Sequence, residues 1–161
     1  MIFLTVGTQF NFDRLVKAVD ELITAGKITD QIFAQIGDAQ YLPKNMQYTQ
    51  LLDKAEFEEK ISKSDGIISH CGIGSIITAL NYNKPLLAFP RLKEYGELVN
   101  NHQMHTAKKF EQLGHILVAY NEAQLPEKIT QLKAFKPTQR IASPEKVAQK
   151  ITEFIKTNIA I

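Results

Sequence analysis

GIISHCGIGS, residues 66–75, is the stretch of the sequence that decides the fold. Its first four residues, Gly66–Ser69, form the short apolar run expected of a strand that is buried on both faces. A glycine turn then leads into a helix, which we expect over Ile76–Tyr82. A buried strand that passes through a short glycine turn into a helix is the repeating unit of a parallel α/β sheet.

The same alternation of strand and helix continues on both sides of residues 66–75. Further strands are expected over the apolar runs Ile2–Val6, Gln31–Ile36, Met46–Leu52, Leu86–Phe89 and His115–Tyr120. Further helices are expected over Phe12–Ala25, Phe57–Ser62, Glu97–Leu113, Glu122–Leu132 and Pro144–Asn158, the last after a linker-like stretch, Lys133–Pro144. Because the strands are apolar throughout, the sequence predicts an α/β fold, a Rossmann-like parallel sheet with helices on both faces.

Length and composition limit the class of protein. The chain has 161 residues, enough for a single domain over residues 1–161. Lys and Arg number 19 and Asp and Glu 17, and this net charge of +2 argues against a nucleic-acid binder driven by bulk charge. One cysteine excludes a disulfide framework and a multi-cysteine zinc site. The sequence has no apolar run of about 18 residues and no signal-peptide pattern, so a cytoplasmic domain is expected.

The turn at Gly72–Ser75 has the features of a phosphate-binding loop. Glycine allows the backbone to approach a ligand closely, and the free N–H groups and dipole of a helix N-terminus attract an anion. The pattern is neither a dinucleotide fingerprint nor a Walker loop, which argues against those ligands. The alternative is a plain tight turn in which Ser75 only caps the helix.

Three other segments follow predicted strands and carry polar groups suited to a ligand. Gly7-Thr8 is a second loop of the glycine kind, unless Thr8 or Asn11 simply caps the next helix. Arg91 suits phosphate because its planar fork bonds two oxygens, unless it lies on the surface. Residues 100–103, NNHQ, have amide groups that read sugar hydroxyls, unless they form a solvated helix face.

Metal binding and nucleophilic catalysis are both disfavoured by the residue pattern. His102 and His105 share a helix face, but no third ligand has matching spacing. His70-Cys71 is reminiscent of a Cys–His pair. A small cysteine at the end of a buried strand is far more often a core residue than a nucleophile.

Taken together, these blocks resemble the C-terminal domain of the family 28 glycosyltransferases. The blocks are Ser69-His70-Cys71-Gly72-Ile73-Gly74-Ser75, Ala79-Leu80, Lys84-Pro85, Pro90-Arg91 and Asn101-His102-Gln103. Two N-terminal blocks, Val6-Gly7-Thr8 and Phe12-Asp13-Arg14-Leu15, are similar to a single-domain branch of that family. That branch includes the catalytic subunit of the split eukaryotic GlcNAc transferase of N-glycan assembly and bacterial proteins of capsule and exopolysaccharide synthesis.

The resemblance implies one lobe of a GT-B fold, equivalent to its C-terminal half, which binds a UDP-sugar donor. The residues that it implies near the donor phosphates are Gly7, Thr8, His70, Gly72, Ile73, Gly74, Ser75 and Arg91. Those that it implies near the sugar and ribose are Thr78, Asn101, His102 and Gln103. Neither a metal ion nor another cofactor is expected.

The sequence departs from the family at one ligand-binding position. Many relatives have a glutamate six residues after the position of Gly72, where its carboxylate binds the ribose hydroxyls. Thr78 occupies that position in this chain. A single hydroxyl cannot reproduce a bidentate carboxylate contact, so ribose recognition must be weaker or differently supplied.

The resemblance also implies a partner. Two-lobed relatives have an N-terminal acceptor lobe, whereas Met1 directly precedes the first predicted strand here. We therefore expect the donor-binding catalytic subunit of a split inverting enzyme, which transfers a hexose from a UDP-sugar to a lipid-linked saccharide in bacterial polysaccharide synthesis. A membrane-anchored acceptor-binding subunit would supply the general base and recruit the chain to the cytoplasmic face of the membrane. The helix over 144–158 is a candidate docking element. The alternative is a non-catalytic activator or stabiliser of a partner glycosyltransferase.

Overall fold

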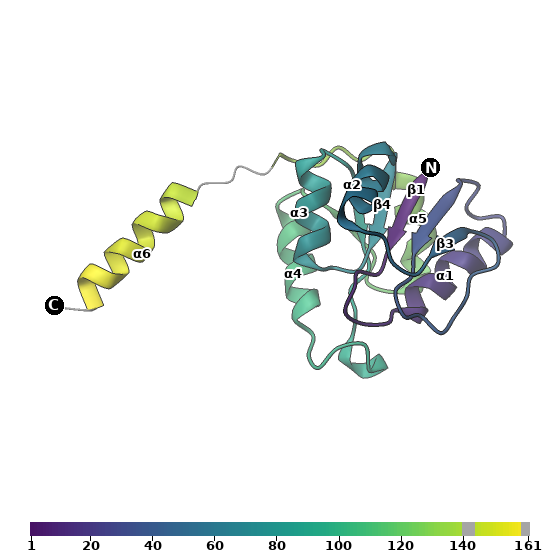
Figure 1. The fold of residues 1–161 in the computed structure, drawn as a ribbon, viewed down its shortest axis with the longest axis horizontal. Coiled ribbons are helices and arrows are strands. Elements are labelled where there is room, and N and C mark those ends of the chain that lie inside the picture. The colour runs from purple at the N-terminus through teal and green to yellow at the C-terminus, as the bar shows by residue number, and fades with distance from the viewer. Residues whose placement is uncertain (140–143, 159–161) are drawn as a thin grey trace.

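The protein forms a six-stranded parallel sheet covered by helices on both faces (Figure 1). The computed structural model describes residues 1–139 and 144–158. The strand order is β3-β2-β1-β4-β5-β6, and every neighbouring pair is parallel. The strands are β1 (Ile2–Thr5), β2 (Ile32–Gln35), β3 (Gln47–Thr49), β4 (Gly66–Ser69), β5 (Leu86–Ala88) and β6 (Leu117–Val118).

Apart from the last one, the helices divide between the two faces of the sheet and enclose two separate apolar cores. One core contains residues of α1 (Asp13–Thr24) and α5 (Leu125–Leu132). The other contains residues of α2 (Lys54–Lys63), α3 (Ile73–Asn81) and α4 (His102–Gln112). Because side chains alternate across a strand, a central strand contributes to both cores. In β1, Ile2 and Leu4 enter the first core and Phe3 the second.

The topology creates a crevice next to the centre of the sheet. From β1 the chain winds outward through β2 to β3, and from β4 it winds the opposite way to β5 and β6. The loops that follow β1 and β4 therefore diverge at the carboxyl end of the sheet. In open α/β sheets, ligands bind at this point of reversal.

The predicted sheet is confirmed, and the expected order of elements is found. The main correction concerns the helix expected over Glu97–Leu113, because α4 begins only at His102. A 3-10 turn, η1 (Lys93–Tyr95), and a left-handed residue, Gly96 with φ 69°, precede it. The side chain of Glu97 bonds to other parts of the chain, so the segment before His102 follows those contacts rather than helical periodicity.

Smaller corrections concern element ends. The strand expected over His115–Tyr120 is reduced to β6, and Glu122–Leu132 divides into a 3-10 turn, η2 (Glu122–Gln124), and α5. Helix α2 begins earlier than expected, at Lys54, because Asp53 and Glu56 form a reciprocal capping box there.

The last helix, α6 (Pro144–Asn158), has the expected bounds (Figure 1). It leaves Ile151, Phe154 and Ile155 exposed, each by 44% or more. Its role as a docking element stays a prediction. Among the helices of the described residues, none has the length and apolar character that crossing a membrane requires.

Candidate functional site

A cavity of about 640 Å³ opens in the crevice between the carboxyl ends of β1 and β4. All of the predicted ligand-binding residues line it except Asn101. They are Gly7, Thr8, His70, Gly72, Ile73, Gly74, Ser75, Thr78, Arg91, His102 and Gln103. The sheet topology thus brings together segments that are separated by almost a hundred residues in the sequence.

The N-terminus of α3 faces the cavity without a side-chain cap. Gly72 is the N-cap residue, and among the described residues no side chain bonds to the N-terminal N–H groups of this helix. The interpretation of Ser75 as a simple cap is therefore wrong. Gly74 is exposed, and a Cβ atom at this position would meet nothing within 4 Å. The first turn thus offers backbone N–H groups and the positive end of a dipole to an anion.

The loop after β1 does not cap the next helix either, although Thr8 and Asn11 were candidates for that role. Phe12 is the N-cap residue of α1, and no side chain in the described part of the chain caps that helix. Thr8 is exposed and lines the cavity together with Gly7. The loop thus faces α3 from the neighbouring strand.

The His70 ring lies against two glycines, one from each loop. A Cβ atom at Gly7 would come within 2.7 Å of His70 Cε1, and one at Gly72 within 2.1 Å of His70 Nε2. Gly7 also has φ 78°, a conformation that favours glycine. Both glycines are therefore required for the ring to fit between the two loops.

His70 is neutral at physiological pH. Burial lowers the pKa of its imidazole to about 4, and the nearby positive charge of Arg91 acts in the same direction. Its Nδ1 lies 3.2 Å from Ser69 Oγ, on the last residue of β4. A neutral ring has one donor and one acceptor nitrogen, so it offers a ligand hydrogen bonding rather than charge.

Because the His70 ring is neutral in the folded chain, we expect the protein to lose folding stability in mild acid. His70 has a lower pKa in the folded chain than the usual 6.5, so the unfolded chain takes up its proton first as the pH falls. We expect the free energy of unfolding to fall by about 2 kcal/mol between pH 7 and pH 5, as measured by urea titration. The variant His70→Gln should lose this dependence. An equal fall in that variant would contradict the assignment to His70.

Cys71 is poorly suited to act as a nucleophile. It is 1% exposed, and burial raises the pKa of its thiol to about 12. A thiol with so high a pKa is protonated at neutral pH and unreactive.

Arg91 holds the loop after β1 in place. Its Nη2 donates to the backbone carbonyls of Val6, at 2.7 Å, and Phe10, at 2.6 Å. The residue is 2% exposed, and burial lowers the pKa of its guanidinium to about 10, which still leaves it charged at neutral pH. Its buried Nε has no partner within the described residues. Arg91 therefore adds positive charge to the cavity while one nitrogen holds the loop.

The start of α4 contributes two polar side chains to the cavity lining. Gln103 is buried, and its Oε1 accepts a hydrogen bond from the Arg91 backbone N–H at 3.0 Å. His102 is exposed, and its Nδ1 lies 2.6 Å from Asn100 Oδ1. Asn101 lies outside the cavity lining, and its Oδ1 instead accepts from the Lys93 N–H at 2.8 Å.

Thr78, the residue at the departure from the family pattern, lines the cavity from the second turn of α3. Its hydroxyl donates to the Gly74 carbonyl at 2.9 Å. Only its acceptor capacity is left for a ligand.

The structure adds cavity residues that the sequence reasoning missed. They are Gln9, Phe10, Gln35, Leu52, Asp53, Lys54, Phe57 and Leu98. Gln35 is 1% exposed at the end of β2, and its Oε1 has no partner in the described part of the chain, although its Nε2 donates to the Gly7 carbonyl at 3.3 Å. Gln35 could have been recognised from the sequence as a polar residue at the end of an otherwise apolar strand. Within residues 1–139 and 144–158, the acidic, histidine and cysteine side chains form no metal-binding group.

Comparison with known proteins places this architecture in a family. Residues 1–158 match the glycosyltransferase family 28 C-terminal domain, and the chain belongs to that family. The fold is the α/β fold found in the C-terminal half of GT-B glycosyltransferases.

Among curated proteins, the chain is similar to "UDP-N-acetylglucosamine transferase subunit ALG13" of several eukaryotes. It is 34% identical to the human protein in an alignment of 124 positions that covers 71% of this chain and 10% of the human protein. It is 36% identical to the Cryptococcus neoformans protein over 92 residues, which are 56% of this chain and 44% of that protein. The chain thus spans well under two thirds of the length of these relatives.

Solved structures show the same fold at low sequence identity. An NMR solution structure of ALG13 is matched with a TM-score of 0.58 and 21% identity, over 96% of both chains. The Os79 protein of O. sativa, crystallised with UDP, is matched with a TM-score of 0.61 and 16% identity, over 96% of this chain and 35% of that one.

Proposed function

We propose that the chain is the donor-binding catalytic subunit of a two-component inverting glycosyltransferase that uses a UDP-sugar. The observation that carries the proposal is the cavity at the point of reversal of the sheet, lined by the uncapped N-terminus of α3. Membership of family 28 supports the chemistry. The curated relatives are called subunits of a UDP-N-acetylglucosamine transferase, which supports both a partner and this donor as the first to test.

In the proposed mechanism this chain binds and stabilises the leaving group. An acceptor hydroxyl oxygen attacks the anomeric carbon, the bond from that carbon to the diphosphate oxygen breaks, and UDP leaves with the electron pair. The first-turn N–H groups of α3 and the positive charge of Arg91 stabilise the negative charge that develops on UDP. The hydroxyl proton passes to a general base, which we assign to the partner subunit. Independence from metal ions stays a prediction.

The finer parts of the proposal concern the acceptor and the location. We propose a hexose as the transferred sugar and a lipid-linked saccharide of bacterial polysaccharide synthesis as the acceptor. We further propose that a membrane-anchored, acceptor-binding partner recruits the chain to the cytoplasmic face of the membrane. These parts are supported by the sequence resemblance alone, and α6 is the proposed docking element.

Ligand-detected NMR tests the donor role. Saturation transfer from the purified chain to UDP and to UDP-N-acetylglucosamine, but not to GDP, is the expected result. Competition among UDP-hexoses then ranks the sugars. If no nucleotide shows saturation transfer, either with the chain alone or with the partner present, the result would contradict the proposal. It would favour the alternative, a non-catalytic activator or stabiliser of a partner glycosyltransferase.

Gly74→Ala is a sharp variant for this test because its effects on folding and on binding have opposite signs. The added methyl group enters open space, so we expect unchanged or slightly raised stability, by up to about 1 kcal/mol. The same methyl group hinders close approach of a diphosphate, so we expect UDP affinity to fall about tenfold, or about 1.4 kcal/mol.

Thermal unfolding and UDP titration measure the two effects of Gly74→Ala. Thr130→Ala is the matched control, because Thr130 is exposed on α5, on the opposite face of the sheet. The control should leave UDP affinity unchanged. Unchanged affinity in Gly74→Ala itself would argue that the diphosphate binds elsewhere.

A further inference from the structure

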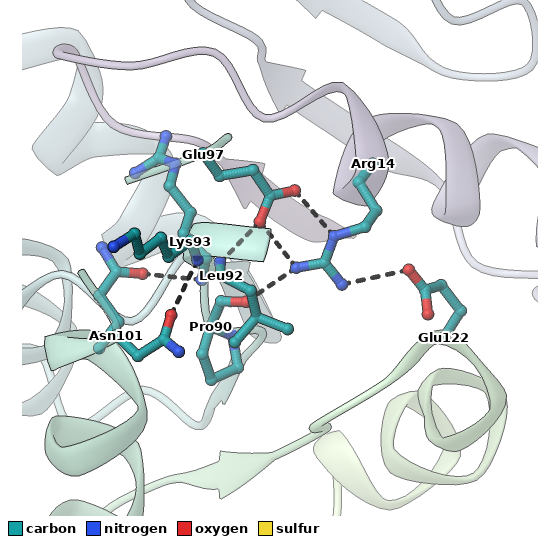
Figure 2. A network of polar contacts seen from close by, with 9 residues as sticks. Arg14, Pro90, Leu92, Lys93, Glu97, Asn101 and Glu122 are labelled. Atoms are coloured by element: carbon teal, nitrogen blue, oxygen red, sulfur yellow. Dashed lines mark hydrogen bonds and ion pairs between the residues drawn. The ribbon is translucent and has the colours of Figure 1, made fainter. Parts of the chain in front are cut away.

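Arg14 is the centre of a polar network outside the cavity (Figure 2). It lies in the first turn of α1 and is 83 residues from Glu97, yet its Nε and Nη2 donate to the two Glu97 carboxylate oxygens at 2.7 and 2.9 Å. Nη2 also donates to the Pro90 carbonyl at 3.0 Å, and Nη1 to Glu122 Oε1 at 3.1 Å. All three guanidinium nitrogens are therefore bonded, and a bidentate pair fixes the carboxylate in one orientation.

Aromatic rings surround the same guanidinium. Its central carbon lies 4.3 Å from the ring centroid of Phe89 and 4.6 Å from that of Tyr95. The Arg14 side chain is 14% exposed and that of Glu97 is 9% exposed. A planar cation held by rings and by a fork of hydrogen bonds is a geometry that lysine cannot reproduce.

The segment held by this network has few other anchors. Every residue from 92 to 101 is exposed or half-buried. Glu97 Oε2 accepts a further hydrogen bond from the Leu92 N–H at 2.8 Å, which closes the segment on itself. Without buried apolar side chains, the position of residues 92–101 depends mainly on the Arg14–Glu97 pair.

This segment leads directly into one wall of the cavity. Leu98, next to Glu97, lines the cavity, and so do His102 and Gln103 at the start of α4. In the proposed function, by contrast, the donor phosphates lie against the loop after β1 and the N-terminus of α3. Arg14 itself lies outside the cavity lining, so its effect on a ligand is indirect. The effect can pass through the segment that it holds, and also through Pro90, which precedes the cavity residue Arg91.

We propose that Arg14 and Glu97 are positioning residues that set the sugar end of the donor cavity. Through residues 92–103 they determine how well the chain distinguishes a UDP-sugar from UDP. The inference rests on the proposed function, because the sugar end is defined only for a bound UDP-sugar.

The test compares two ligands on four variants of the full chain. Dissociation constants for UDP and UDP-N-acetylglucosamine are measured for Arg14→Met, Arg14→Lys, Glu97→Gln and the control Lys17→Met. The control Lys17→Met removes the same charge from the same helix. The Lys17 side chain is 58% exposed and pairs with Glu21. We expect Arg14→Met to weaken UDP-N-acetylglucosamine about tenfold and UDP less than twofold. Arg14→Lys and Glu97→Gln should follow the same pattern, and Lys17→Met should change neither affinity.

The outcomes separate the two levels of the proposal. If the wild-type chain binds no UDP, either alone or with the partner present, the proposed function is overturned, and this inference with it. If the wild-type chain binds UDP and Arg14→Met loses affinity for both ligands equally, the role of Arg14 is merely structural. If a folded Arg14→Met variant loses affinity for neither ligand, Arg14 has no role in binding. If Arg14→Met fails to fold, the ratio of the two affinities in Glu97→Gln decides instead.

Discussion

Gly72→Ala is expected to unfold at markedly lower denaturant concentration than the wild-type chain and to lose UDP binding. The new Cβ atom would lie 2.1 Å from His70 Nε2 and 2.8 Å from Cδ2, so the ring must leave its place. Gly7 blocks the other side, where a Cβ atom would come within 2.7 Å of the same ring. Overpacking of this kind typically costs about 1–3 kcal/mol, which urea unfolding measures directly.

A double-mutant cycle isolates the contact between Gly72 and His70. Adding His70→Ala to Gly72→Ala removes the ring that the methyl group strikes, so part of the lost stability should return. We expect a coupling energy of at least about 1 kcal/mol. Strictly additive losses would contradict the steric explanation. UDP binding should stay weak in the double variant, because the ring that joins the two loops is gone.

Arg91→Met is the second variant with a large expected effect. It removes the donors to the Val6 and Phe10 carbonyls and leaves the loop after β1 without its main polar anchor. A buried acceptor that loses a charged donor costs about 1–3 kcal/mol, so we expect a loss of about 3 kcal/mol for the two together. UDP affinity should fall more than tenfold, because both the loop position and a positive charge are lost.

Arg91→Lys separates these two contributions. Lysine keeps the charge but lacks the fork that reaches two carbonyls. Stability close to that of Arg91→Met, with UDP affinity between that variant and wild type, would show that charge and loop position act separately. Full UDP affinity in a folded Arg91→Met would exclude Arg91 from donor binding. Chemical-denaturant unfolding and UDP titration on the same samples provide both measurements.

The architecture was predictable because local signals agreed with one another. The apolar runs at β1 and β4, the glycines after them and the helical periodicity over Phe12–Ala25 all indicate a parallel α/β sheet. Since the carboxyl ends of parallel strands meet at one edge, the same reasoning also predicted which loops would come together. Gly7 and Gly72 were recognised as loop glycines in this way, although the His70 ring between them was not.

Other parts depended on pairs that are distant in the sequence. Residues 97–101 were predicted to be helical, but Glu97 pairs with Arg14, 83 residues away, and α4 begins only at His102. Arg91 was predicted to face a phosphate, yet its Nη2 bonds to two carbonyls of the β1 loop. Gln35 was assigned only to a strand, and it lines the cavity with an oxygen that has no partner among the residues that the structure describes.

The sequence by itself therefore determined the fold class, the order of strands and helices along the chain, and the loops that carry the site. Hydrophobic periodicity and glycine placement are local properties, and the near-universal right-handed crossover converts them into a sheet topology. Only the tertiary structure decided which polar groups are available to a ligand and which are already bonded within the protein. A hydrogen bond such as that from Arg91 to Val6 joins residues 85 apart, and its formation depends on distances that exist only after the sheet has assembled.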